Sequence, residues 1–352
     1  MGAEQPRVTI REIARHAGVH KSTVSRALRA AKDPHVSDAP SAEVTERIVA
    51  IARELGYQPD HVAASLTTRR TRTIGVLVPR LTDVVLATIY EGIESVVRPS
   101  GYQAVVANTY DDPEQQRELI ELMQSRRIDG LIVADARLDG DHLGSARVPV
   151  VLVNRRVPGR PSVSCDDAAG GRLVAGHFAE LGHTDVAIIA GPPWASTSVD
   201  RTSGCVTALR EHGIKVARNS IVNSGFDSHS GYTTAHELLR RRKPPTAIFA
   251  ENDYAAIGVV AALRDLGVRP GNDVAVCGFN DIDLARQLPL PLTSVDSDAT
   301  SMGTMAGRAI IDALDGHEVT SVFTTPTLQV RSTTVPGAGA AEHRPMRRAV
   351  TG

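Results

Sequence analysis

Near the amino terminus, apolar side chains recur at the spacing of a helix face in three short segments. These segments cover residues 9–17, 20–29 and 41–55. The first opens on Thr9 and Glu12, which form a capping box in which each side chain bonds the backbone of the other residue. Gly18 and Gly56 follow the first and third segments, where a left-handed residue commonly ends a helix. The pattern predicts three short helices with a tight turn between the first two.

The second predicted helix has an apolar side and a polar side. Val24, Ala27 and Leu28 fall together and are expected to face the core. The opposite side carries hydroxyl and basic residues, namely Ser22, Ser25, Arg26 and Arg29, with Lys21 at the exposed helix start. This arrangement is typical of a helix-turn-helix, whose second helix enters the major groove of DNA. A small helical bundle with a solvated polar face is the alternative interpretation.

Charge is distributed unevenly along the chain. The whole sequence has 39 Lys and Arg against 40 Asp and Glu, a net charge of −1. Residues 1–72 hold 12 basic against 8 acidic residues, a net +4, whereas the remainder holds 27 against 32, a net −5. A basic head on an acidic body is expected of a DNA-binding module. The asymmetry therefore favours DNA binding over the solvated bundle.

From residue 73 onward, short β-branched runs alternate with helical stretches. Strands are expected at 74–78, 104–107, 131–134 and 150–153, and in a second series at 186–190, 247–250 and 274–277. Helices are expected near 84–98, 113–126, 168–181, 200–212, 229–241 and 253–266. Repeated βα units predict two doubly wound parallel sheets. Ligands of such sheets bind beyond the carboxyl ends of the strands.

Polar residues that follow the predicted strands are therefore candidate ligand contacts. They are Asp83, Asn154, Thr197, Arg201, Asn252, Asp253, Asn280 and Asp281. Taken singly, each is equally explained as a loop cap or a surface ion pair. Together, carboxylate, amide and guanidinium groups offer the donors and acceptors that hold the hydroxyls of a sugar.

Length and composition exclude several classes of protein. A chain of 352 residues is expected to form two or three folding units. Cys165, Cys205 and Cys277 are odd in number and widely spaced, which favours buried thiols in a reducing cytosol. Because no apolar run resembles a signal peptide or a membrane span, we expect a soluble, cytoplasmic protein.

Catalytic and metal motifs are not found in the sequence. It has no GxSxG elbow, P-loop, HExxH or strand-following GxGxxG, so we expect neither enzymatic activity nor a cofactor. Asp281 and Asp283 could form a metal pair, but no oxygen-rich loop accompanies them, and loop polarity is the preferred interpretation. His177 and His183 flank a predicted helix end and are expected to be structural.

Several motifs resemble those of the lactose-repressor (LacI/GalR) family. They are Ile13-Ala14, Ala17-Gly18-Val19, TVSRAL at 23–28, ELGYQP at 54–59 and VAASL at 62–66, and the likeness extends to about residue 335. The resemblance implies an α + α/β protein: a three-helix helix-turn-helix domain, then a periplasmic-binding-protein-like body of two doubly wound lobes. It also implies three crossovers between the lobes, near residues 164, 292 and 325, with a ligand cleft between the lobes.

The resemblance assigns roles to residues of the head. The base-reading positions are Lys21, Ser22 and Arg26, and the phosphate contacts are Thr23, Ser25 and Arg29. Lysine favours the O6 and N7 atoms of guanine, whereas serine is nearly indiscriminate, so the chemistry supports one guanine preference per half-site. Leu66 matches a leucine that opens a minor-groove step in family members.

The head departs from the family pattern in two places. The connection between Arg26 and Ser41 is about six residues longer than usual in the family. Asp60 stands where asparagine is common, which adds a negative charge near DNA. The first change is expected either to move the third helix or to loop out, and the second to weaken the hinge contact.

In the body, the resemblance implies an effector site. Arg201 fits the spacing of the family's effector-binding arginine, Asn252 and Asp281 match other polar contacts, and Phe226 matches an aromatic wall. With the post-strand candidates, the expected effector-binding residues are Asp83, Asn154, Thr197, Arg201, Phe226, Asn252 and Asp281. The family often has phenylalanine near residues 85–86, and its absence here argues against a stacked purine. Trp194 and Phe226 are the expected stacking surfaces, and a carbohydrate is the favoured effector.

These expectations define a domain organisation and a function. The predicted parts are a helix-turn-helix domain at 1–58, a hinge at 59–72, a two-lobed effector-binding and dimerisation domain at 73–335 and a disordered tail at 336–352. We expect a homodimeric transcription regulator, a repressor, that binds a pseudo-palindromic operator in double-stranded DNA and responds to a sugar. A cytosolic sugar sensor or carrier is the second interpretation, and a sugar-converting enzyme on the same fold is the third.

Overall fold

The computed structural model describes residues 8–31, 38–57, 70–140 and 143–336. The chain divides into two compact units, residues 1–71 and 72–352, which are called the head and the body. The predicted minor-groove residue Leu66 and the departure at Asp60 lie outside the described residues. No helix among the described residues is long and apolar enough to cross a membrane.

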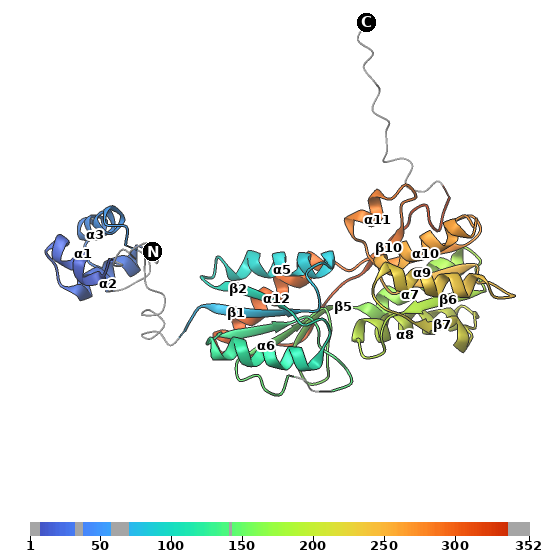
Figure 1. The fold of residues 1–352 in the computed structure, drawn as a ribbon, viewed down its shortest axis with the longest axis horizontal. Helices are drawn as coiled ribbons and strands as arrows, with labels where there is room; N and C mark the ends of the chain where they lie inside the picture. Colours follow the sequence, from blue (N-terminus) through green and yellow to red (C-terminus); the bar gives the residue numbers. More distant parts are fainter. Residues whose placement is uncertain (1–7, 32–37, 58–69, 141–142, 337–352) are drawn as a thin grey trace, which may run out of the picture. The chain divides into compact units, whose positions relative to one another are not determined.

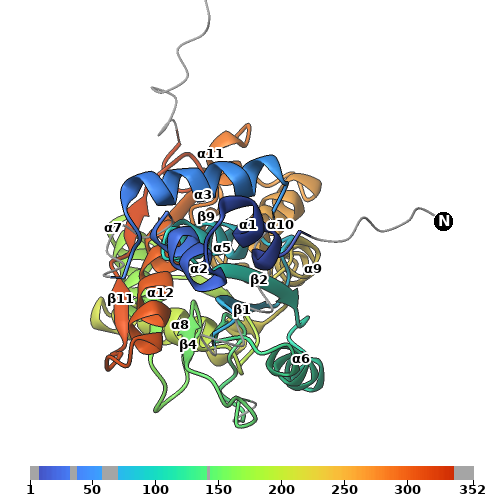
Figure 2. The same cartoon turned by 90° about the vertical axis from the view of Figure 1, so that its left-hand side faces the viewer.

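The described part of the head contains three helices, whose bounds lie within about a residue of the predicted ones. They are α1 (Ile10–Ala17), α2 (Lys21–Ala30) and α3 (Ala42–Glu54). The capping box at Thr9 and Glu12 is present, and Gly18 has a left-handed φ of 67°. Ile13, Val24 and Ile48, one from each helix, are fully buried in a shared core. Figure 2 shows the three helices packed together, with α3 across the other two. The turn between α1 and α2 is thus fixed by a small apolar core.

The described residues of the body form two six-stranded sheets; the βα alternation predicts the two sheets and seven of these strands. The first has the order β11-β5-β4-β3-β1-β2, and all its strand pairs are parallel. Its strands are β1 (Thr73–Val78), β2 (Gln103–Asn108), β3 (Gly130–Val133), β4 (Val150–Val153), β5 (Ser162–Cys165) and β11 (Val322–Thr324). On one face lie α5 (Val84–Val97) and α12 (Ala299–Leu314), and on the other lies α6 (Pro113–Ser125) (Figure 1). We call this layered unit the first lobe.

The second sheet and its helices form the second lobe. Its order is β12-β10-β9-β8-β6-β7, parallel except for the β10–β12 pair. Its strands are β6 (Val186–Ala190), β7 (Ile221–Asn223), β8 (Ala247–Ala250), β9 (Ala275–Asn280), β10 (Thr293–Asp296) and β12 (Thr327–Gln329). Its helices are α7 (Asp167–Glu180), α8 (Ser196–Glu211), α9 (Ser228–Leu239), α10 (Asp253–Asp265) and α11 (Asp283–Gln287), with the short helix η1 (Arg218–Ser220). Helices α7 and α8 pack as one pair and α9 and α10 as another.

The chain passes between the lobes three times. It crosses after β5, after β10 and between β11 and β12, within a few residues of the crossovers that the family resemblance implies. Because the central strands of each sheet are covered by helices on both faces, their side chains are almost entirely buried. The carboxyl ends of these strands are left to form a site between the lobes.

Candidate functional site

A cavity of about 460 Å³ lies between the two lobes of the body and is called the effector cavity. Residues that follow β1, β2 and β4 line it from the first lobe, and residues that follow β6, β7, β8 and β9 line it from the second. The cavity therefore lies at the carboxyl ends of the parallel strands of both sheets. This is where doubly wound sheets bind their ligands, and the volume suits a small molecule.

The structure brings six of the seven predicted effector-binding residues to this cavity. They are Asp83, Asn154, Thr197, Arg201, Phe226 and Asn252. Two of the predicted contacts are partly engaged within the protein: the Asn252 side chain caps α10 and also donates to the Phe226 carbonyl oxygen at 2.9 Å. Asp83 caps α5 through the Val85 amide, and burial raises the pKa of its carboxyl group. The ligand-binding role of the six residues remains a prediction.

Arg201 is held in place by the close packing of α7 and α8. A Cβ atom at Gly171 would lie 2.1 Å from the Arg201 carbonyl oxygen, so only glycine permits this approach. The approach places Asp167, at the start of α7, 2.7 Å from the Nε atom of Arg201. The guanidinium also donates to the Glu251 carbonyl oxygen at 2.9 Å and lies over the Phe279 ring. The protein itself thus supplies Arg201 with an ion pair, a carbonyl acceptor and a ring contact.

The buried charges around Arg201 perturb one another. Burial raises the pKa of Asp167 to about 6, against the attraction of Arg201, and burial also raises the pKa of Glu251. Burial alone would lower the pKa of Arg201, but the two carboxylates outweigh it and raise that pKa. Arg201 thus stays charged and is already paired with protein carboxylates.

Arg155 is a cavity residue that sequence reasoning missed. Its side chain is only 5% exposed and forms an ion pair with Asp111, which also lines the cavity. Its guanidinium lies 5.0 Å from the centre of the Trp194 ring and 5.1 Å from that of Phe226. Trp194, an expected stacking surface, is not among the lining residues. Its ring instead contacts the guanidinium groups of Arg155 and Arg137. Its place in the sequence could have indicated this role, because Arg155 directly follows the predicted contact Asn154 after β4.

Several residues around the cavity adopt left-handed backbone conformations. Tyr110, Asp111, Asn154 and Asn280 line the cavity and have φ values from 57° to 100°. Such conformations are uncommon for residues other than glycine, and they concentrate at ligand-binding sites. The turns that carry polar side chains into the cavity are thus locally strained.

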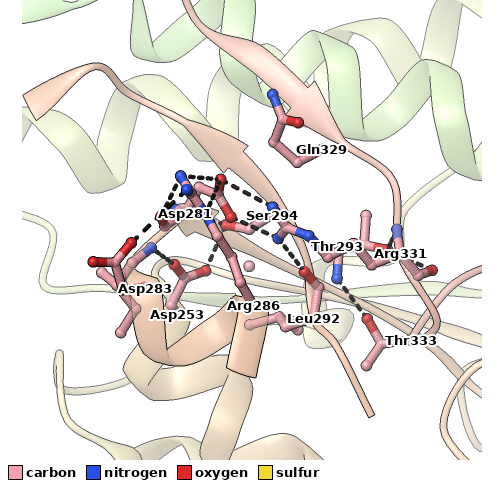
Figure 3. A network of polar contacts seen from close by, with 12 residues as sticks. Asp253, Asp281, Asp283, Arg286, Leu292, Thr293, Ser294, Gln329, Arg331 and Thr333 are labelled. Atoms are coloured by element: carbon pink, nitrogen blue, oxygen red, sulfur yellow. Dashed lines mark hydrogen bonds and ion pairs between the residues drawn. The ribbon is translucent and has the colours of Figure 1, made fainter. Parts of the chain in front are cut away.

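Asp281 is the one predicted effector contact that does not line the cavity. Its side chain is 1% exposed and forms an ion pair with Arg331, with atoms 2.6 and 3.0 Å apart. Arg286 contacts the same carboxylate at 2.9 Å (Figure 3). Asp281 therefore ties the loop after β9 to the segment after β12. Asp283, its possible metal partner, is 95% exposed, and the described residues contain no group of metal-ligating side chains.

The predicted DNA-contacting surface of the head is accessible on α2. Lys21, Ser22 and Arg29 are exposed, whereas Thr23, Ser25 and Arg26 are partly buried. The side chain of His20 caps the helix by accepting from the Ser22 amide, and it also contacts the Ser22 hydroxyl at 2.8 Å. This cap was not predicted from the sequence.

Arg29, a predicted phosphate contact, already has an acidic neighbour. Its guanidinium lies 3.6 Å from the carboxylate of Asp38, and both side chains are more than half exposed. Asp38 belongs to the connection between α2 and α3.

A helix-turn-helix head and a two-lobed body with an interlobe cavity define a class of ligand-responsive DNA-binding regulators. Residues 9–60 match the family described as bacterial regulatory proteins, lacI family, and residues 175–334 match the periplasmic binding protein-like domain. The chain is 30% identical over 333 residues to the HTH-type transcriptional repressor PurR of Vibrio atlanticus, covering 92% of this chain and 98% of that protein. This chain belongs to the LacI family.

Two solved structures show the same architecture. The lac repressor dimer bound to operator and the anti-inducer ONPF has a TM-score of 0.84 and 26% identity, and the match covers 94% of this chain and 99% of that chain. The complex of the transcriptional regulator CelR with cellobiose has a TM-score of 0.70 and 28% identity, over 93% of this chain and all of that chain. The expected fold, a helix-turn-helix domain with a two-lobed parallel-sheet body, is confirmed.

Proposed function

We propose that this protein is a homodimeric transcriptional repressor that binds a pseudo-palindromic operator and is switched by a neutral carbohydrate in the effector cavity. The PurR and lac repressor relatives support the repressor and the dimer, since both are named as repressors and the second is a dimer on operator DNA. The exposed Lys21 and Ser22, with the partly buried Arg26 on the same helix, support major-groove binding by α2.

The charge of the cavity wall carries the proposal of a neutral effector. The basic residues Arg80, Arg155 and Arg201 face the acidic residues Asp83, Asp111, Asp227 and Glu251. Arg155 and Arg201 are already paired with carboxylates. Of the three arginines among the described lining residues, this leaves only the exposed Arg80 to attract an anion. A net negative wall disfavours an anionic ligand, whereas a polyol meets both donors and acceptors.

Two further features fit a carbohydrate. The Nε atom of Arg155 is buried without a hydrogen-bond partner in the structure, and a ligand oxygen would supply one. Phe226, Tyr110 and Tyr254 give the cavity aromatic surface for the C–H face of a sugar ring. The cellobiose complex of a relative is consistent with this class of ligand.

The switch requires that the effector bind one arrangement of the lobes better than another. In this structure the lobes contact each other beside the cavity, where Arg156 forms two hydrogen bonds with Asp200, at 2.8 and 3.0 Å. The Leu138 amide also donates to the Trp194 carbonyl oxygen across the same boundary. A sugar that contacts both lobes would stabilise such a closed arrangement, and in a dimer this would change the spacing of the two heads.

Operator selection tests the proposal. The purified full chain is incubated with random duplexes at moderate salt, with and without a pooled sugar library. Enrichment of a two-fold-symmetric site that one sugar weakens or strengthens is the expected result, and it fixes the sign of the switch. Lys21→Ala should abolish enrichment, whereas Arg53→Ala, which removes the same charge from the exposed side of α3, should not.

A second pair of variants separates regulator from carrier and enzyme. Thr197→Val is expected to remove the sugar response and keep operator binding, and Thr233→Val on an exposed position of α9 should keep both. A sugar bound without any effect on enriched DNA, or no enrichment at all, would favour a carrier. Chemical conversion of the bound sugar, followed by mass spectrometry, would identify an enzyme.

A further inference from the structure

The second lobe has another pocket, at the opposite ends of its strands. This pocket, of about 280 Å³, is lined by residues that precede β6, β7 and β8, including Thr184, Asn219 and Pro245. The effector cavity lies at the carboxyl ends of the same strands, so the sheet separates the two sites. We call this second site the basic pocket.

Charge distinguishes the basic pocket from the effector cavity. Its lining has three cationic side chains, Lys215, Arg241 and Lys243, and Asp185 is the single acidic side chain among the described residues that line it. Lys243 lies 2.6 Å from Asp185, but its side chain is 77% exposed, so the pair is weak and the ammonium group is free to move. The wall therefore carries a net charge of +2, the opposite sign to that of the effector cavity.

The geometry of the pocket orders part of this charge. The Nη1 atom of the exposed Arg241 donates to the Asn219 carbonyl oxygen at 2.8 Å, which holds the guanidinium beside another lining residue. The hydroxyls of Thr184 and Ser220 and the amide of Asn219 provide neutral polar groups in the same lining. Further basic residues, Arg240 and Arg242, flank Arg241 in sequence and are exposed.

We propose that the basic pocket binds a small phosphate-bearing metabolite, with the phosphate contacted by Lys215, Arg241 and Lys243. Arginine and lysine are the side chains that recognise phosphate through charge-assisted hydrogen bonds. A concave site of this size favours a small molecule over DNA or an acidic protein segment, which need extended surfaces. The protein thus has two ligand sites of opposite charge, one for a neutral effector and one for an anion.

The test uses the full chain and two probes, inorganic pyrophosphate and glycerol 3-phosphate, in calorimetric titrations at constant ionic strength. Glycerol is the uncharged control, and sodium sulfate reports binding of any dianion. Saturable binding of at least one phosphate probe, at one site per chain and tighter than sulfate, is expected. Lys215→Ala and Arg241→Gln should each weaken it about tenfold, since each removes one charged contact.

Two control variants make the result specific. Arg126→Ala removes an exposed arginine from the end of α6 in the other lobe and should leave binding unchanged. Arg80→Ala removes a cation from the effector cavity and should also leave it unchanged. Thermal melting checks that the Arg241→Gln variant is folded. Because Lys215 is exposed, Lys215→Ala is expected to fold, and it keeps the test valid if the Arg241→Gln variant is unfolded.

Three results would overturn the proposal. One is the absence of saturable binding by either phosphate probe. Another is binding that is lost in Arg80→Ala but kept in Lys215→Ala, which would place the anion in the effector cavity. The last is equal affinity for sulfate and both phosphates together with no effect of Lys215→Ala, which would indicate non-specific attraction. None of these results depends on whether the protein binds an operator or a sugar.

Discussion

The buried Asp281 and the partly buried Arg331 form a two-oxygen ion pair, with contacts of 2.6 and 3.0 Å, that joins the loop after β9 to the segment after β12. Arg331 also donates to the Leu292 carbonyl oxygen at 2.7 Å, so one guanidinium anchors three parts of the second lobe (Figure 3). Asp281, which was expected to bind a ligand, thus helps to hold the loops around β9, β10 and β12 together.

Replacing Asp281 with alanine should therefore destabilise the body more than it affects ligand binding. Removing one partner of a fully buried pair leaves the other charge uncompensated, at a cost of about 3–5 kcal/mol, and the partial exposure of Arg331 places the expected cost at the lower end of this range. Urea unfolding of Asp281→Ala should show a loss of this order in the free energy of unfolding. Asp283→Ala, two residues away at a 95% exposed side chain, is the control and should change it by less than about 0.5 kcal/mol. Equal stability of the two variants would show that the pair contributes little.

A second prediction concerns Asp253, whose side chain lies beneath this ion pair. It accepts hydrogen bonds from the Ile282 amide at 2.8 Å and the Ser294 hydroxyl at 2.5 Å. Burial raises its pKa to about 7, from 3.8 for a free aspartate. The folded state therefore binds a proton more tightly than the unfolded state. It follows that the contribution of Asp253 to stability is lost as the pH rises from about 4 to about 7.

Asp253→Asn should remove this pH dependence, because asparagine resembles the protonated acid. Relative to wild type, the variant should gain stability as pH rises through the window between 4 and 7, by at most about 1.4 kcal/mol per pH unit. Urea midpoints measured across this range give the difference. Asp312→Asn, at an exposed position on α12, should run parallel to wild type. A constant offset between Asp253→Asn and wild type would contradict a raised pKa.

The pattern of the sequence predicted the central strands of both sheets, because strands buried on both faces are continuous apolar runs. It missed β5 and β10, whose sequences SVSC and TSVD mix small polar residues with apolar ones, and it also missed the three-residue strands β7, β11 and β12. The hydroxyls of β10 are satisfied inside the fold: Thr293 donates to the Arg331 carbonyl oxygen and Ser294 to Asp253. Hydroxyl-rich strands therefore become recognisable only once their tertiary partners are known.

For the candidate site, the predicted strand ends indicated where polar side chains lie, but not which residues they pair with. Polar residues after each strand were correctly expected to be near a cavity, as Asn154 and Thr197 are. The sequence could not show that Asp281 is turned to Arg331, fifty residues further along the chain, or that Arg155 is turned into the cavity wall. Both choices depend on long-range charge pairing, which has no local signal.

A third prediction concerns the head. Asp38→Ala removes the carboxylate that lies 3.6 Å from Arg29 and should free this arginine for a DNA phosphate. Operator affinity should rise a few-fold at low salt, and the slope of log affinity against log salt should steepen by up to about one unit. Fluorescence anisotropy with the selected operator measures both. Glu46→Ala, which removes an equal charge from an exposed position on α3, should produce a smaller change and leave the slope unchanged. A loss of affinity in Asp38→Ala would show that the connection needs this carboxylate.

The last prediction concerns the contact between the lobes. Arg156 and Asp200 are 39% and 19% exposed, so their two hydrogen bonds are partly screened, and the pair is expected to contribute up to about 1 kcal/mol. Because the pair joins the lobes, Asp200→Ala should raise the population of chains with an open cavity. The apparent effector affinity is proportional to the fraction of chains in the binding-competent arrangement. A loss of up to about 1 kcal/mol therefore lowers this affinity by up to about fivefold. Calorimetry with the sugar found by operator selection gives the affinity, and small-angle scattering of the free protein should show a larger radius of gyration. Glu211→Ala is the matched control, since it breaks an Arg–carboxylate pair between α7 and α8 inside one lobe and should change neither quantity. If both variants bind the sugar like wild type, the ion pair does not set the opening of the cavity, and the contacts of Arg155 with Trp194 and Phe226 become the next candidates.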